Sequence, residues 1–266
     1  MRTGLIHRRP VSIAALALLA GAAPAFAAPD WDIVGIRLGM SPAEARAALS
    51  AHAPKAQITD YTRQFVYSDG VQQKPLPGFL SVINASQGPT NKSETLEVMF
   101  SAPPMEQRVI RVIRTLAMYD DPLPMARAMA SVTQKYGKPA TVLEANMGSG
   151  NFSRWLEPGK TACGDTAPTS MDARQPPPVD NAPNGFSQYG LWQRRKLAPA
   201  DASNCSAALV VNLVTRPGDP FVREMKFTMT DPGYAVPAMR AVAKQIADLE
   251  AQARKARLNS GPVPKL

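Results

Sequence analysis

The stretch Arg37–Leu49, RLGMSPAEARAAL, carries the best-defined helix start in the chain. Ser41 is a good N-cap, and Pro42 fits the first helical position. Glu44 lies three residues after Ser41, which is the spacing of a capping box. The pattern predicts a helix over residues 42–52, whose apolar face is formed by Ala45, Ala48 and Leu49. The ordered domain therefore begins shortly before this helix.

Upstream of this helix, residues 1–27 have the pattern of a secretory signal peptide. Arg2, Arg8 and Arg9 form a positive region, an apolar run follows, and residues 25–27, AFA, form a cleavage site. Gly21 and Pro24 break the apolar run, which is shorter than a membrane span requires. We expect export, by the general secretory or the twin-arginine route, and a mature chain that is periplasmic or secreted and has no transmembrane segment.

The mature chain of 28–266 is long enough for one large domain or two small ones. The formal net charge of the whole sequence is +9, and three of these charges are the arginines of the signal segment. The remaining positive charge is spread along the chain. It is compatible with anionic lipid, lipopolysaccharide or an acidic partner, and it requires none of them.

Cys163 and Cys205 are the two cysteines, and an even number in an exported chain predicts a disulfide. The segment that they would close contains a polar loop, 163–187, rich in Pro, Asp, Asn and Thr. In the chain-entropy model such a bridge contributes roughly 4 kcal/mol. Two free thiols or a redox pair remain as alternatives.

Downstream of the first helix, short strand patterns alternate with two further helices. We expect helices over about 122–136, ending at Gly137, and over about 236–257. Asp120 and Asp121 precede the middle helix and are expected to cap it. The segment 107–119 fits a strand or a helix, and its many β-branched residues favour the strand.

This order predicts an α+β fold, with antiparallel sheet and helices packed on one side. We expect one domain over 28–258, followed by a flexible tail, 259–266. The order of elements also suggests two divergent helix-plus-sheet halves, 28–105 and 106–258, joined around residues 103–122.

Few residues in the mature chain have the chemistry of a catalytic centre. His52 is its single histidine, and its place at a helix C-terminus favours a dipole interaction over a catalytic role. The sequence has no phosphate loop and no Cys/His zinc pattern. Two alternatives remain open. Carboxylates acting alone would make the protein a hydrolase, and the methionines would make it a small-ligand or metal carrier. We name no catalytic residue, cofactor or metal ligand.

Two groups of residues are candidates for a binding surface. Trp155 and Trp192 flank the polar loop and are either core anchors or contact residues. Arg108, Arg111 and Arg114 line the ambiguous segment and form either a solvated strand face or a contact for phosphate groups. Because no nucleic-acid motif accompanies them, we expect no nucleic-acid partner.

Two short patterns, GIRLGMSPAEARAAL at 35–49 and KYGKP at 135–139, carry a family resemblance. The first resembles the opening of secreted proteobacterial proteins of uncharacterised function. It is also similar to the helix start of small outer-membrane lipoproteins that assist β-barrel assembly, and of β-lactamase-inhibitor-like domains. The resemblance implies a small helix-on-sheet module that binds proteins. The chain departs from it in lacking a lipid-bearing cysteine and in having HAPKA after the first helix.

Taken together, these patterns predict a non-catalytic binding module of the cell envelope. Its expected partner is a protein or an envelope component, bound through the sheet or through the loop between the cysteines.

Overall fold

The computed structural model describes residues 30–144, 150–161 and 204–260. The predicted signal segment, the polar loop 163–187, Cys163, Trp192 and the last residues of the predicted tail lie outside these ranges.

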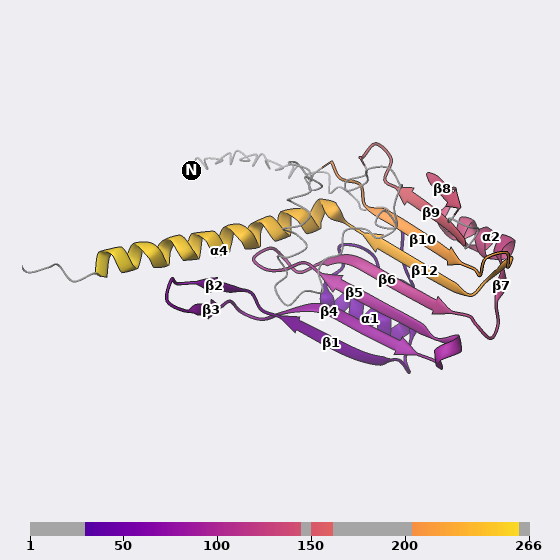
Figure 1. The fold of residues 1–266 in the computed structure, drawn as a ribbon, viewed down its shortest axis with the longest axis horizontal. Helices are drawn as coiled ribbons and strands as arrows, with labels where there is room; N and C mark the ends of the chain where they lie inside the picture. The colour runs from indigo at the N-terminus through magenta and orange to yellow at the C-terminus, as the bar shows by residue number, and fades with distance from the viewer. Residues whose placement is uncertain (1–29, 145–149, 162–203, 261–266) are drawn as a thin grey trace, which may run out of the picture.

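A single antiparallel sheet of eight strands forms the body of the protein, in the order β1-β4-β5-β6-β12-β10-β9-β8 (Figure 1). Strands that follow one another in the chain are neighbours in most places, although the connection from β9 to β10 spans residues 157–207. The bounds of its strands are β1 Gln57–Arg63, β4 Phe79–Gln87, β5 Glu94–Phe100, β6 Val109–Ala117, β8 Thr141–Glu144, β9 Gly150–Leu156, β10 Ala208–Val214 and β12 Glu224–Thr230. The antiparallel α+β fold predicted from the sequence is confirmed.

The sheet is made of two halves with the same order of elements. Helix α1 (Pro42–His52) precedes the meander β1-β4-β5-β6, and helix α2 (Met125–Tyr136) precedes the meander β8-β9-β10-β12. The halves join where β6 pairs with β12. Strand β6 pairs with β5 of the first half and with β12 of the second. The short strands β7 (Leu123–Pro124) and β11 (Phe221–Val222) pair with each other.

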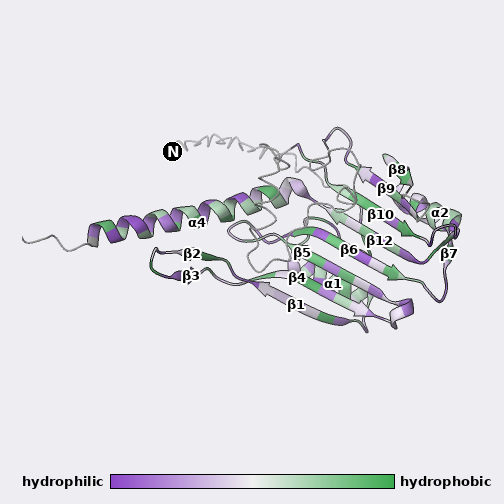
Figure 2. Cartoon of the chain, in the orientation of Figure 1, coloured by the Kyte–Doolittle hydropathy of each residue, from purple (hydrophilic) through white to green (hydrophobic). Residues whose placement is uncertain are grey.

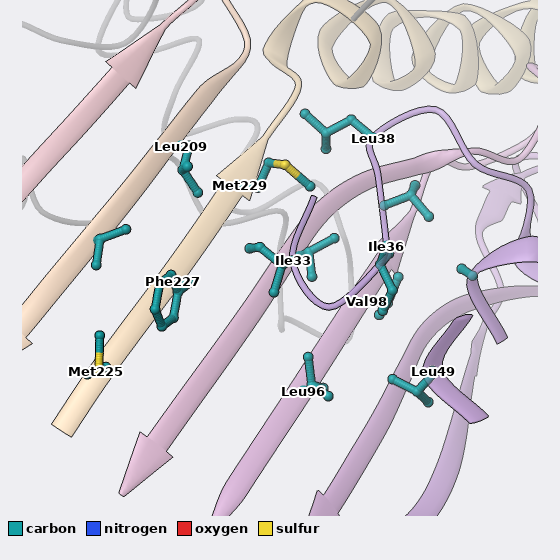
Figure 3. Close-up of a cluster of buried hydrophobic side chains, with 14 of the residues drawn as sticks. Ile33, Ile36, Leu38, Leu49, Leu96, Val98, Leu209, Met225, Phe227 and Met229 are labelled. Carbon is teal, nitrogen blue, oxygen red and sulfur yellow. The ribbon is translucent and has the colours of Figure 1, made fainter. Parts of the chain in front are cut away.

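The main hydrophobic core lies between one face of the sheet and the two shorter helices. Leu96, Val98 and Met229 point from the strands toward Ile33 and Ile36, in the segment before α1 (Figure 3). Leu49 of α1 and Val132 of α2 reach the same cluster. Alternation along each strand places these side chains on one face, which we call the covered face. The other face, opposite α1 and α2, we call the open face. It is exposed only in part: Ser86 and Thr95 are exposed, whereas Met99, Arg111 and Thr228 are buried.

The local signals around α1 act as predicted. The Ser41 hydroxyl accepts a hydrogen bond from the Glu44 backbone N–H at 3.3 Å, and the Glu44 carboxylate accepts one from the Ser41 backbone N–H at 2.8 Å. Helix α2 ends at Gly137, also as predicted, where φ is 78°. It begins later than predicted, at Met125, and its N-cap is Pro124 without a side-chain cap. The capping role expected for Asp120 and Asp121 is therefore wrong, because β7 separates them from the helix.

Helix α4 (Pro232–Ser260) is longer than predicted and runs away from the sheet beside a hairpin (Figure 1). That hairpin, β2 (Val66–Ser68) with β3 (Gln73–Pro75), is inserted between β1 and β4. A second, small core joins Val242 of α4 to Phe79 and Phe65. Purple and green alternate along the exposed length of α4 in Figure 2, as expected for a helix outside a core. None of the helices that the structure describes is long and apolar enough to span a membrane.

Candidate functional site

The densest cluster of charged side chains on the covered face is centred on Glu94, at the start of β5. Its Oε1 lies 2.8 Å from His52 Nε2 and accepts a hydrogen bond from Arg114 Nε at 2.6 Å. Its Oε2 accepts a hydrogen bond from the Gln87 amide at 2.7 Å. We call these four residues the Glu94 cluster.

The electrostatics of the Glu94 cluster favour a carboxylate. Burial alone would raise the pKa of Glu94, but the hydrogen bonds from His52 and Gln87 and the charge of Arg114 hold that pKa below its ordinary value. The Glu94 side chain is 11% exposed, whereas those of His52 and Arg114 are 27% and 22% exposed. The cluster thus ties the C-terminal end of α1 to three strands of the sheet, β4, β5 and β6.

The contacts of Glu94 make it a weak base. Both of its oxygens accept hydrogen bonds from the protein, and these bonds with the charge of Arg114 hold its pKa low. Across the described ranges, no group of three or more His, Cys, Asp or Glu residues is placed to hold a metal ion. The contacts of the Glu94 cluster hold the C-terminal end of α1 against the sheet.

The open face carries rows of small polar side chains. Ser86, Thr95, Thr115, Lys226 and Asn212 are direct partners across β4, β5, β6, β12 and β10. Direct partners in an antiparallel sheet share a face, so these five form one continuous row. Ser86 and Thr95 are exposed, and the other three are half-buried.

A second row on the open face contains an acidic residue and an unsatisfied amide. Asn84 pairs with Glu97, and Glu97 pairs with Ile113. The Oδ1 atom of Asn84 is buried and has no hydrogen-bond partner. A buried acceptor without a partner costs free energy, so native structures contain few of them.

Arg111 lies beside this second row and is a second unsatisfied group. Arg111 pairs with Met99 on β5, and Met99 lies two residues after Glu97. Arg111 is only 5% exposed. Its Nε has no hydrogen-bond partner. Loss of hydration lowers the pKa of Arg111, and the charge of Glu97 opposes that shift. Among described residues, Asn84 and Arg111 hold the only buried side-chain nitrogen or oxygen atoms without a partner, and both lie on the open face.

The three predicted arginines do not form one surface. Segment 109–117 is a strand, as its composition predicts, so Arg111 and Arg114 lie on opposite faces. The solvated position expected for Arg111 is wrong, because it is buried. Arg114 lies in the Glu94 cluster, with its guanidinium 5.8 Å from the centre of the Phe227 ring. Arg108 is at the surface, where it pairs with Glu106 at 2.5 Å.

The predicted tryptophans are also separated. Trp155 is 3% exposed and donates a hydrogen bond from Nε1 to the Gly137 carbonyl oxygen at 3.0 Å. Its ring packs against Tyr136 at 5.9 Å. Of the two roles open for Trp155, the core role is correct and the contact role is wrong. Trp192 lies outside the described residues.

One of the two cysteines of the predicted disulfide, Cys205, lies within the described residues. Cys205 is buried, and its backbone forms a parallel bridge with Thr161. Asn204 donates a hydrogen bond to the Thr161 hydroxyl at 3.3 Å. These contacts bring the chain to within two residues of position 163 beside Cys205. Since Cys163 itself is outside the described ranges, the pairing stays a prediction.

Searches of family models, of curated proteins and of solved structures gave no match to this chain.

Sequence reasoning missed both the Glu94 cluster and the unsatisfied groups of the open face. Glu94 is separated from His52 by 42 residues and from Arg114 by 20, so no local spacing relates them. The signal that was present is alternation in residues 94–100, which assigns Glu97 to the face opposite Leu96 and Val98. Alternation does not reveal which residues of the neighbouring strands share a face with Glu97.

Proposed function

We propose that this chain is an exported, non-catalytic binding module that docks a protein partner on the open face of its sheet. The observation that carries the proposal is the polar row of the open face, whose members are exposed or half-buried: Ser86, Thr95, Thr115, Lys226 and Asn212. The export and the envelope location rest on the predicted signal segment 1–27.

The composition of the open face favours a protein partner. Rows of hydroxyl and amide side chains offer donors and acceptors across four neighbouring strands, and a rigid sheet holds them in place. Asn84 Oδ1 and the Arg111 side chain are buried in the chain itself, so a partner would contact the exposed and half-buried row and not these two groups.

The test is affinity capture from the envelope fraction with matched variants. Thr95→Arg places a long cation at an exposed position of the open face, and Ala130→Arg makes the same charge change at an exposed position of α2, on the other side. We expect a protein that is captured by the wild type and by Ala130→Arg but lost with Thr95→Arg. Capture that survives Thr95→Arg and is lost with Ala130→Arg would contradict docking on the open face.

The export part of the proposal has its own test. Mass spectrometry of the protein from the periplasmic or secreted fraction should find a chain that begins at Ala28. A full-length chain that stays in the cytoplasm would contradict the envelope assignment, while leaving the fold and the open face as they are.

A further inference from the structure

Helix α4 and the β2–β3 hairpin together form an arm that stands out from the sheet (Figure 1). Its base is the small core in which Val242 and Ile246 pack on Phe65 and Phe79, whose rings stack at 5.4 Å. Farther out, the Ser68 backbone N–H donates a hydrogen bond to Glu250 Oε1 at 3.1 Å. From Val242 to the end of α4, the helix rises by about 27 Å at 1.5 Å per residue.

The far end of the arm carries two strongly exposed apolar side chains, one on the hairpin and one on the helix. The guanidinium of Arg257 lies against the backbone of Gly70 in the hairpin turn. Val71 follows Gly70, and Leu258 follows Arg257. Their exposures, 83% and 78%, are the highest of any large hydrophobic residue in the described parts of the chain. We call the turn at 69–72 together with residues 251–259 the arm tip.

The charges of the arm tip are mostly positive. After Glu250, α4 contains Arg254, Lys255 and Arg257 and no acidic residue. In the hairpin turn, Asp69 accepts hydrogen bonds from two backbone N–H groups and faces Lys74 at 3.6 Å. One exposed face of α4 is formed by residues spaced three, four and seven apart: Ala251, Arg254, Lys255 and Leu258.

Ordinary helix chemistry explains only part of this arrangement. Cations in the last turn of a helix complement its dipole, which accounts for Arg257. The dipole does not account for Leu258 on the same exposed face as Arg254 and Lys255, or for the exposure of Val71 in the hairpin turn. Exposed apolar side chains surrounded by cations are the pattern of elements that lie on an anionic lipid surface.

We propose that the arm tip docks on the surface of a lipid bilayer that carries anionic headgroups. Leu258 and Val71 enter the boundary between headgroups and acyl chains, and Arg254 and Lys255 contact the lipid phosphates. A bilayer accepts single protruding side chains and requires no matching pocket, whereas a protein partner would require one. The arm would then hold the sheet at a distance from the membrane, with the open face accessible.

The experiment measures partition of the purified exported protein onto vesicles. Vesicles of phosphatidylglycerol mixed with phosphatidylcholine are compared with vesicles of phosphatidylcholine alone, by co-sedimentation. Mass spectrometry first establishes the N-terminus, so that a retained leader is not mistaken for the arm. Wild type should bind the anionic vesicles, and binding should fall as ionic strength rises.

Three variants separate the arm tip from the rest of the chain. Arg254→Gln with Lys255→Gln should lower the partition coefficient about 25-fold, at about fivefold per cation. Leu258→Ser should lower it by about tenfold. Lys244→Gln is the matched control, because Lys244 is on the same helix, nearer the body, and pairs with Asp248 at 2.6 Å. It should change binding by less than about twofold.

Two results would overturn the inference. One is the absence of binding to anionic vesicles by a folded wild-type protein, with folding verified by circular dichroism. The other is an equal loss of binding in Lys244→Gln and in the double variant. Neither result bears on the open face, whose test uses Thr95→Arg.

Discussion

Replacing Glu94 by Gln is the most informative perturbation of the fold. The Gln keeps the shape of the side chain but removes the negative charge that Arg114 approaches at 2.6 Å and His52 at 2.8 Å. A hydrogen bond to a charged group contributes about 1.5–3 kcal/mol. His52 and Arg114 are each about a quarter exposed and regain some hydration, so we expect a net loss of about 2 kcal/mol in the free energy of unfolding.

Urea unfolding at neutral pH measures this loss as a lower midpoint at an unchanged slope. Glu106→Gln is the matched control, because it makes the same chemical change at a side chain that is 65% exposed. Its effect should be within about 0.5 kcal/mol of zero. If Glu94→Gln costs no more than Glu106→Gln, the Glu94 cluster does not hold α1 to the sheet.

The pH dependence of the same pair of proteins follows from the sign of the pKa shift. The pKa of Glu94 in the folded protein is below its ordinary value of 4.5. A carboxyl whose pKa is lowered by folding binds protons more readily in the unfolded chain. Its contribution to the free energy of unfolding is therefore complete above pH 4.5 and is lost as pH falls through the pKa of the folded protein. The stability difference between wild type and Glu94→Gln should therefore shrink progressively below pH 4.5. A difference that grows in acid would contradict the assignment.

The remaining predictions concern single residues, and urea unfolding measures each of them. Trp155→Ala should cost about 3–5 kcal/mol, because it removes a buried ring and its hydrogen bond to Gly137; a loss below 1 kcal/mol would contradict its core position. Ser41→Ala should cost about 1 kcal/mol, by opening the capping box with Glu44; an unchanged midpoint would show that the cap does not limit stability. Arg111→Met should leave stability unchanged or raise it, since burial of the guanidinium is poorly compensated; a loss above 2 kcal/mol would show that Glu97 compensates it well.

Local signals in the sequence were sufficient for the helix ends and for the type of sheet. The capping box at Ser41 and the stop at Gly137 act within a few residues, so they are readable without tertiary structure. Alternation within residues 109–117 likewise placed Arg111 and Arg114 on opposite faces.

What the sequence did not reveal depends on contacts between distant segments. Arg111 has the same local pattern as an exposed strand residue, and only the packing around β6 makes it buried. The run from Tyr61 to Tyr67 alternates throughout, yet the structure breaks it at 64–65 into β1 and β2, because β2 leaves the sheet to lie beside α4. Leu258 is exposed because α4 extends beyond the sheet.

Site-specific photocrosslinking in intact cells tests the central claim, that the open face docks a protein. A photoreactive amino acid is placed at Thr115, in the middle of the polar row, or at Ala130 on the outer side of α2. We expect a crosslink to one protein from position 115, its loss when Thr95→Arg is added, and no crosslink to that protein from position 130. A protein crosslinked equally from both positions, or from position 130 alone, would contradict it.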